Sequence, residues 1–351
     1  MDDTAPTHSA SANAPDIFDR TFLRSADDLS GLYLMMLKGG LSKHSRDEVG
    51  RATAHFVRNK LVRQIRSMKT PLDPDGTAIV KTLAKKGYTF IPDVFSAEDI
   101  TEIKRFTQNR KVGISAYGNE AEVPFPEVPP DANFAHFHFL DFGGCAPIYR
   151  LVHDERLIRM MTHYLGAPPT IGIISLWWSY APPGAPEGMQ MFHHDRGDFR
   201  SCNLFTYLTD VDLGTGPHAY VERTHEVDIL GPLTQERFAS QPEMHQKFWQ
   251  WMEQHRKTDE EVRRFFPESE IKFFTGRQGT TFLEDTRGLH KGTRPTTGPR
   301  LAFEIFFGVM PKYNEAITPL VRADLDLPPE LNVPTDKLDP LVRYATRQFY
   351  V

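Results

Sequence analysis

The amino-acid sequence predicts an α+β protein: a mainly β core flanked by helices. From Ile171 onward the chain is rich in β-branched and aromatic residues. Within that part, the segment 300–307 sends alternate residues to opposite faces, as a strand does. The N-terminal third instead shows apolar residues every three or four positions, which is typical of helices. We therefore expect helices first and a sheet core after them.

Length, charge and cysteine content narrow the class of protein. A chain of 351 residues buries a sizeable core as one large or two modest domains. The net charge of -5 argues against a dedicated nucleic-acid binder. The two cysteines, Cys145 and Cys202, fit a reducing cytosol better than a disulfide scaffold. The acidic start lacks a signal-peptide pattern, and no run approaches the roughly 18 apolar residues of a membrane span. We expect a cytoplasmic protein with no membrane partner.

Composition divides the chain into three regions. Residues 1–18 have the composition of a disordered tail. Residues 19–70 form a helical region, with one helix from the Ser25–Asp28 cap to Gly39-Gly40 and another over about 46–68. Residues 71–351 form the β-rich domain. The second helix carries basic residues that we expect to form a solvated face rather than an anion site: Arg46, Arg51, Arg58, Lys60, Arg63, Arg66 and Lys69.

Further elements follow from turn and capping signals within the third region. Capping residues and glycines predict four helices: one that ends at Gly87, one from Ser96 to Phe106, one over 146–165 and one over about 339–348. Strands are predicted at 88–91, 136–138 and 175–179. The proline-rich segment 123–130 is predicted to be a loop near the site. A helical insertion at about 226–272 is either a lid over the barrel mouth or a satellite pair of helices, and its sequence favours neither.

The residues that indicate chemistry lie in the stretch 191–195, which has the sequence Met-Phe-His-His-Asp. If this stretch is extended, His193 and Asp195 share one face and His194 points to the other. One histidine and one carboxylate are two thirds of a 2-His-1-carboxylate metal site, which holds Fe(II) and leaves positions open. The pattern is weak alone, because 14 histidines supply chance partners. The distal histidine is predicted to be His290.

A second stretch, 279–308, supports that choice. Arg300 stands ten residues after His290 (300 − 290), beyond a segment, 294–299, with the composition of a hairpin turn. Alternation places Arg300 and Glu304 on an inner face with Ala302 and Phe306. The outer face is apolar and comprises Leu301, Phe303, Ile305 and Phe307. An arginine one strand beyond a metal-binding histidine can clamp the carboxylate of a chelating co-substrate.

Together these motifs resemble the phytanoyl-CoA dioxygenase family of Fe(II)/2-oxoglutarate-dependent oxygenases. The similarity comprises the His193-x-Asp195 motif, the distal His290 and Arg300, and three further stretches: 203–212, 216–221 and 282–292. It covers roughly residues 75 to 310. The chain departs from the family at 223–225, where Arg-Thr-His replaces the usual Gly-Ser-His, so the local loop is expected to differ.

The resemblance implies a fold and an activity. The fold is an antiparallel jelly roll, the double-stranded β-helix also found in cupins, which makes 71–351 an oxygenase domain. His193, Asp195 and His290 would hold Fe(II), and Arg300 would bind the far carboxylate of 2-oxoglutarate. With O2 as the other co-substrate, the reaction would hydroxylate a small organic molecule and release succinate and CO2. A carboxylate at position 195 favours hydroxylation over the halogenation seen where a small residue stands there.

Further site residues are implied by the resemblance to the family or by their nearness in sequence to His290. Phe205, Trp177 and Thr293 are expected beside the co-substrate, although core or turn positions are as plausible for each. Glu284, Asp285 and Arg287 are expected to form a network that positions His290. The rival metal ligands, in order, are His194, which faces the other way, and then His218 and His225.

Three alternatives stay open at the level of sequence. The same metal site could serve desaturation, cyclisation or epoxidation of a biosynthetic intermediate. A non-catalytic metal-binding jelly roll could sense a small molecule, but such a protein has no need of Arg300 beside the metal. Zinc hydrolysis also suits two histidines and an aspartate with an open position. The sequence does not select among an acyl-CoA, an amino acid, a terpenoid or polyketide intermediate and a sugar as substrate, and it indicates no oligomeric state.

Overall fold

The fold is taken from a computed structural model that describes residues 16–20, 22–23, 34–36, 38–114, 122–311 and 317–351. Most of the predicted tail 1–18 and the cap of the first predicted helix, Ser25 and Asp28, lie outside these residues. Among the described residues, no helix is both long enough and apolar enough to cross a bilayer.

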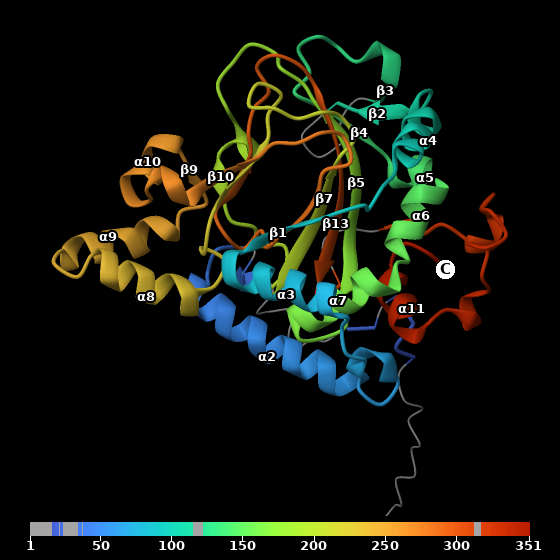
Figure 1. The fold of residues 1–351 in the computed structure, drawn as a ribbon, viewed down its shortest axis with the longest axis horizontal. Helices are drawn as coiled ribbons and strands as arrows, with labels where there is room; N and C mark the ends of the chain where they lie inside the picture. Colours follow the sequence, from blue (N-terminus) through green and yellow to red (C-terminus); the bar gives the residue numbers. More distant parts are fainter. Residues whose placement is uncertain (1–15, 21, 24–33, 37, 115–121, 312–316) are drawn as a thin grey trace, which may run out of the picture.

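Two antiparallel sheets form the centre of the molecule (Figure 1). The larger sheet has the strand order β1-β11-β7-β13-β5-β4-β2-β3 and the smaller one β10-β8-β12-β6-β9. The strands of the larger sheet are β1 (Tyr88–Ile91), β2 (Lys111–Gly113), β3 (Glu122–Pro124), β4 (Phe134–Phe137), β5 (Thr170–Ser179), β7 (Ser201–Tyr207), β11 (Thr281–Glu284) and β13 (Arg300–Gly308). Those of the smaller sheet are β6 (Phe192–His193), β8 (His218–Val221), β9 (Arg256–Lys257), β10 (Ile271–Phe274) and β12 (His290–Gly292).

The order in which the chain visits the two sheets defines a jelly roll. Strands β5, β7, β11 and β13 lie in the larger sheet, and β6, β8, β10 and β12 lie in the smaller sheet that faces it. The predicted fold class is therefore confirmed. One detail of the prediction is wrong: β12 and β13 belong to different sheets, so the segment 293–299 crosses between sheets and is not a hairpin turn.

Helices flank the sheets, and their ends follow the capping signals. They are α2 (Lys43–Leu61), α3 (Pro74–Lys86), α4 (Ala97–Thr107), α5 (Phe139–Phe142), α6 (Ala146–Val152), α7 (Glu155–Leu165), α8 (Val227–Arg237), α9 (Pro242–Met252), α10 (Asp259–Phe265) and α11 (Pro340–Thr346). Ser96 caps α4 in a complete capping box, as expected. The helix predicted over 146–165 is two helices, because Asp154 leaves the helix and accepts a hydrogen bond from the Leu157 N–H as the N-cap of α7.

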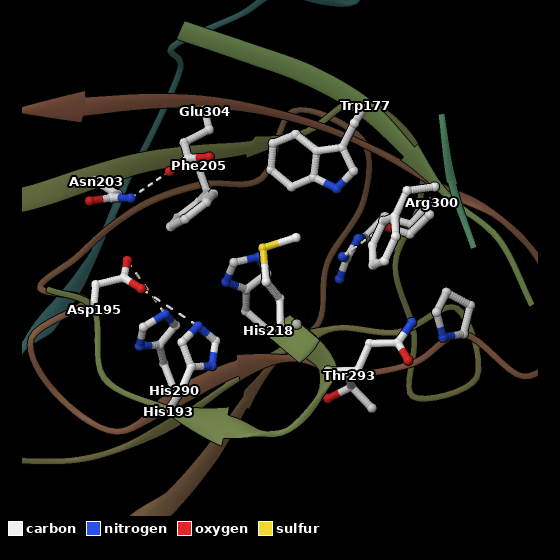
Figure 2. Close-up of a pocket in the computed structure, with 16 residues that line it drawn as sticks. Trp177, His193, Asp195, Asn203, Phe205, His218, His290, Thr293, Arg300 and Glu304 are labelled. Atoms are coloured by element: carbon white, nitrogen blue, oxygen red, sulfur yellow. Dashed lines mark hydrogen bonds and ion pairs between the residues drawn. The ribbon is translucent and has the colours of Figure 1, made fainter. Parts of the chain in front are cut away.

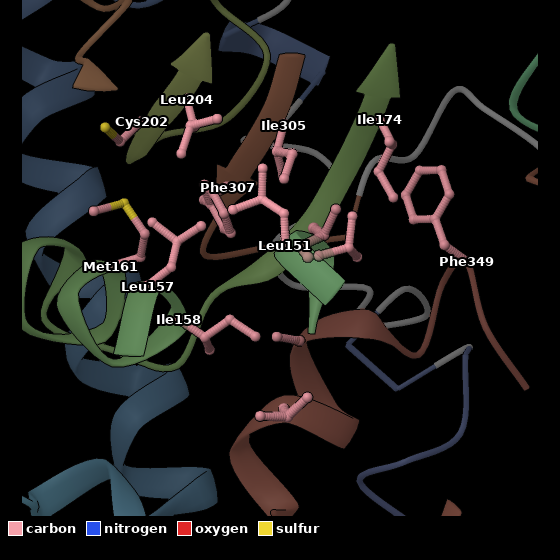
Figure 3. Close-up of a cluster of buried hydrophobic side chains, with 14 of the residues drawn as sticks. Leu151, Leu157, Ile158, Met161, Ile174, Cys202, Leu204, Ile305, Phe307 and Phe349 are labelled. Atoms are coloured by element: carbon pink, nitrogen blue, oxygen red, sulfur yellow. The ribbon is translucent and has the colours of Figure 1, made fainter. Parts of the chain in front are cut away.

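The main hydrophobic core lies between the larger sheet and the helices beneath it. Figure 3 shows Leu157 and Met161 of α7 beside the strands that carry Leu204 and Ile305, and Ile158 belongs to the same cluster. The four outer residues of β13, Leu301, Phe303, Ile305 and Phe307, are at most 1% exposed in this cluster. Burying one face of β13 under helices sends its other face, with Arg300 and Glu304, between the sheets.

The insertion forms a second hydrophobic cluster on the smaller sheet. Phe248, Trp251 and Met252 of α9 pack in one cluster with Phe192 of β6 and Val221 of β8. Strand β9 of the insertion also pairs with β6 and so extends the smaller sheet. The helices of the insertion therefore pack on the outer side of this sheet, while β9 runs beside His193, whose register partner is Arg256.

Candidate metal centre

Two neighbouring strands of the smaller sheet bring the predicted histidines together. His193 on β6 is the direct register partner of His290 on β12, and their ring centroids lie 4.3 Å apart. The strand within the stretch 191–195 is shorter than expected, because only Phe192–His193 pairs in a ladder. Asp195 lies in the loop beyond, where its backbone N–H donates to the Thr286 carbonyl at 2.7 Å. That hydrogen bond returns the carboxylate to the same side as His193.

The three side chains converge on one small volume. His193 Nε2 lies 3.6 Å from Asp195 Oδ1, and His290 Nε2 lies 3.9 Å from Asp195 Oδ2. One ligand atom from each of the three residues lies within 4.8 Å of the others, a spacing that suits a metal ion. Figure 2 shows the two rings side by side with the carboxylate above them.

Backbone hydrogen bonds set the tautomer of both rings. His193 Nδ1 lies 2.8 Å from the Met191 carbonyl, and His290 Nδ1 lies 3.0 Å from the Gly288 carbonyl. Since a carbonyl only accepts, each Nδ1 carries the proton and each Nε2 presents a lone pair toward Asp195. Burial and the neighbouring His290 lower the pKa of His193 well below its usual value, so this ring is neutral. Neutral imidazoles with Nδ1–H donated to carbonyls are the form that binds metals.

The rival ligand His194 faces the other side of the strand, as predicted. Its Nε2 accepts from the Arg46 guanidinium at 3.3 Å, which occupies the lone pair that a metal would need. Arg46 itself is buried beside His194 rather than on a solvated helix face, which corrects the expectation for that residue. His225 is also turned away, because its Nε2 lies 3.1 Å from the Ala84 carbonyl.

Arg300 is a buried cation on the inner face of β13. It is 2% exposed, and its guanidinium donates to the Gly216 carbonyl and to Ser179 Oγ, the latter at 3.2 Å. Gly216 has a φ of +82°, and a Cβ there would lie 2.4 Å from the Thr293 carbonyl, so the position requires glycine. Burial lowers the pKa of Arg300 from its ordinary value. Among the described residues, no carboxylate lies within 4.0 Å of this guanidinium.

Arg300 and the three metal-site residues line one cavity. Trp177, Phe205 and Thr293, the weaker predictions, line it as well. Thr293 Oγ1 is buried with no hydrogen-bond partner among the described residues, and so has a donor to offer a ligand. Figure 2 places Arg300 at one end of the cavity and Asp195 at the other.

The network predicted behind His290 forms only in part. Arg287 donates from Nε to Asp285 Oδ1 at 3.0 Å, and it also reaches Glu226 at 3.2 Å. Glu284 is not a member, which corrects the prediction. Strand alternation turns Glu284 inward from β11, while Asp285 and Arg287 face the helices.

Sequence reasoning missed a polar chain beside Asp195. The Asn203 side-chain amide donates to Glu304 (Figure 2). Its Oδ1 accepts from Thr286 Oγ1 at 3.2 Å. The Thr286 carbonyl in turn holds the Asp195 N–H. The available signal was the alternation of β7, which puts Asn203 on the same face as Phe205.

Comparisons with known proteins give low similarities. No model of a known protein family matches the chain, and no curated protein matches it significantly. Among solved structures, it is similar to the non-heme α-ketoglutarate-dependent epimerase SnoN from nogalamycin biosynthesis (16% identity, 67% of this chain and 83% of that chain, TM-score 0.41). It is also similar to HygX from Streptomyces hygroscopicus with nickel and 2-oxoglutarate bound (17% identity, 71% of this chain and 91% of that chain, TM-score 0.44). A third similar structure is EctD from S. alaskensis with 2-oxoglutarate and 5-hydroxyectoine (17% identity, 68% of this chain and 77% of that chain, TM-score 0.40). At these values the similarities carry no argument about activity, which depends on the site itself.

Proposed function

We propose that the chain is an Fe(II)- and 2-oxoglutarate-dependent dioxygenase of the phytanoyl-CoA dioxygenase family. It hydroxylates a small organic molecule at an unactivated C–H. One observation carries the proposal: a facial set of two lone-pair-bearing histidines and a carboxylate shares a cavity with a buried arginine that has no carboxylate partner among the described residues. The two histidines and the carboxylate suit Fe(II) with open coordination positions. The buried arginine requires an anionic ligand to compensate the burial of its charge.

Each residue has a defined task in this proposal. His193, Asp195 and His290 hold the metal, and the Met191 and Gly288 carbonyls keep both rings in the ligating tautomer. Arg300 binds the far carboxylate of 2-oxoglutarate through its planar guanidinium. When bound, the metal with 2-oxoglutarate and O2 supplies the oxidising power that converts C–H to C–OH, with succinate and CO2 released. Trp177 and Phe205 give the cavity aromatic walls that limit access of water.

The proposal extends to the organisation of the chain. We propose that 71–351 is the oxygenase domain with its insertion at about 226–272, and that 19–70 is a helical region that supports it. Contacts of α2 with the oxygenase domain support this division of roles: the buried Lys43 Nζ donates to the His225 carbonyl at 2.7 Å and to the Arg287 carbonyl at 3.3 Å.

Reconstitution of the purified protein tests the function. Fe(II) with 2-oxoglutarate under anaerobic conditions is expected to give a weak visible charge-transfer band, and Zn2+ is expected to give none. On admission of air, the Fe(II) sample should release succinate slowly without a prime substrate. The His193→Ala variant is the matched control and should do neither. A protein that binds metal but gives no band, and no succinate with any of a broad panel of substrates, would be a metal-binding sensor instead.

A further inference from the structure

A buried acid–histidine pair lies inside the jelly roll and has no role in the proposed metal site. His218 Nδ1 on β8 and Glu284 Oε2 on β11 face each other at 3.5 Å. Glu284 is 0% exposed and His218 is 4% exposed. Neither the His218 Nδ1 nor either Glu284 oxygen has a hydrogen-bond partner among the described residues. Leaving two such polar groups unpaired in the interior is costly, and a proton placed between them would remove that cost.

The position of His218 connects the two ends of the cavity. His218 lines the cavity, and its ring packs 4.3 Å from that of Phe205. On the adjacent strand β12, the register partner of His218 is Gly292, two residues beyond His290. Figure 2 shows the ring between the His193–Asp195–His290 group and Arg300. A ligand that spans from the metal to Arg300 therefore passes His218.

The proton shared with Glu284 fixes what His218 presents to that ligand. If the Glu284 carboxylic acid donates to Nδ1, a neutral ring carries its own proton on Nε2. If the proton moves to Nδ1, the ring is cationic and Nε2 is still protonated. A ring with its only proton on Nδ1 would leave Nε2 bare. Beside a protonated Glu284 it would also leave the acid O–H without an acceptor, because neither Glu284 oxygen has another partner among the described residues. Beside a Glu284 carboxylate it would place a net negative charge in the interior, where Glu284 is 0% exposed.

We propose that His218 is a further anchoring residue for the anionic co-substrate, with Glu284 as the residue that sets its tautomer. The Nε2–H of His218 donates to a carboxylate of 2-oxoglutarate between the metal site and Arg300. The inference rests on the proposed function, because it needs the same co-substrate in the same cavity. It also separates His218 from the role of rival metal ligand, since a protonated Nε2 and an Nδ1 engaged by Glu284 leave no lone pair for a metal.

Binding of 2-oxoglutarate to the Ni(II)-loaded protein, measured by calorimetry, tests the proposal without turnover. His218→Phe keeps an aromatic ring against Phe205 and removes both nitrogens, and we expect it to raise the Kd for 2-oxoglutarate about 10- to 100-fold. His218→Gln retains an N–H near the Nε2 position and should recover most of that loss. Ni(II) stoichiometry should stay at the parent value in both variants.

Two further variants serve as controls for a general loss of structure. His153→Phe removes a partly buried histidine, stacked 3.9 Å from Tyr149 outside the cavity, and should alter the unfolding temperature without altering the Kd. If His218→Phe does not fold with Glu284 left unpaired, the double variant His218→Phe/Glu284→Leu replaces both polar groups by apolar ones and should fold with the same loss of binding.

The outcomes separate this inference from the proposed function. An unchanged Kd in His218→Phe or in the double variant, with Arg300→Leu impaired, overturns the role of His218 and leaves the function standing. Loss of Ni(II) in His218→Phe would make His218 a ligand and overturns the proposal as well. A parent protein that binds Ni(II) but not 2-oxoglutarate removes both proposals. In the supporting outcome, proton-detected ¹⁵N spectra of histidine-labelled protein show an Nε2–H signal that disappears in His218→Phe.

Discussion

Replacing Arg300 by leucine separates co-substrate binding from metal binding. The guanidinium is buried, contacts only neutral groups (Gly216 O, Ser179 Oγ and the Tyr207 ring 6.0 Å away) among those the structure describes, and touches no metal ligand. Loss of a charge-assisted bidentate contact should cost about 2–4 kcal/mol of 2-oxoglutarate binding, a factor of about 30 to 1,000 in Kd. Metal stoichiometry should not change.

Thermal unfolding gives an independent measure of the same loss. At a 2-oxoglutarate concentration of about 100 times its Kd, the metal-loaded parent gains about 2.7 kcal/mol of stability. At that concentration a variant that binds a hundredfold more weakly gains only about 0.4 kcal/mol. Without 2-oxoglutarate, Arg300→Leu should unfold at a temperature no lower than the parent does, because it removes a buried charge that lacks a counter-charge.

The reasoning fails if the Kd of Arg300→Leu stays within about threefold of the parent value, roughly 0.6 kcal/mol. Another basic group would then hold the co-substrate. Arg300→Lys is the matched variant: it keeps the charge but loses the planar fork, and it should fall between parent and Arg300→Leu.

Two further predictions concern the surroundings of the metal. His193→Ala should lose bound iron and turnover, while His194→Ala should keep iron and turnover and lose about 1–3 kcal/mol of stability as Arg46 loses its acceptor. Iron per chain after anaerobic desalting measures the first effect and chemical denaturation the second. The reverse pattern of iron loss would place the ligand at His194. Asp285→Asn should destabilise the fold by about 3–5 kcal/mol, because it leaves Arg287 buried with a weaker partner. Burial alone would raise the pKa of Asp285, but Arg287 outweighs it and holds the pKa well below the ordinary 3.8. The stability difference should therefore be complete above about pH 4 and shrink as the pH falls further, and a difference that grows toward acid pH would contradict this.

The sequence was sufficient for features that local chemistry determines. Alternation along 300–307 placed Arg300 inside and Leu301 under the helices, since a strand's period is fixed by its backbone. The same rule separated His193 from His194. The cap of α4 at Ser96 was equally local. The break at Asp154 had a local signal too, an N-cap residue inside an apolar pattern, but the periodicity on either side masked it.

Features set by distant segments were not predictable in this way. The pairing of His218 with Glu284 depends on strands 66 residues apart (284 − 218) that lie in different sheets. The segment 294–299 has turn composition whether it joins paired strands or crosses between sheets, and only the topology decides. Arg46 looked like part of a solvated basic face because helical periodicity does not show which partner covers a face.

The N-terminal helix α2 supports the metal site from two directions. On one side Arg46 engages His194, the residue after the ligand His193. On the other, Lys43 and Asp47 contact Arg287 in the loop that precedes His290, through the Arg287 carbonyl at 3.3 Å and the guanidinium at 3.7 Å. Both ligand strands therefore have part of their outer surroundings built from one helix turn that precedes the jelly roll in sequence. Because histidine orientation depends on such outer contacts, removing α2 should weaken metal binding even though no ligand lies on it.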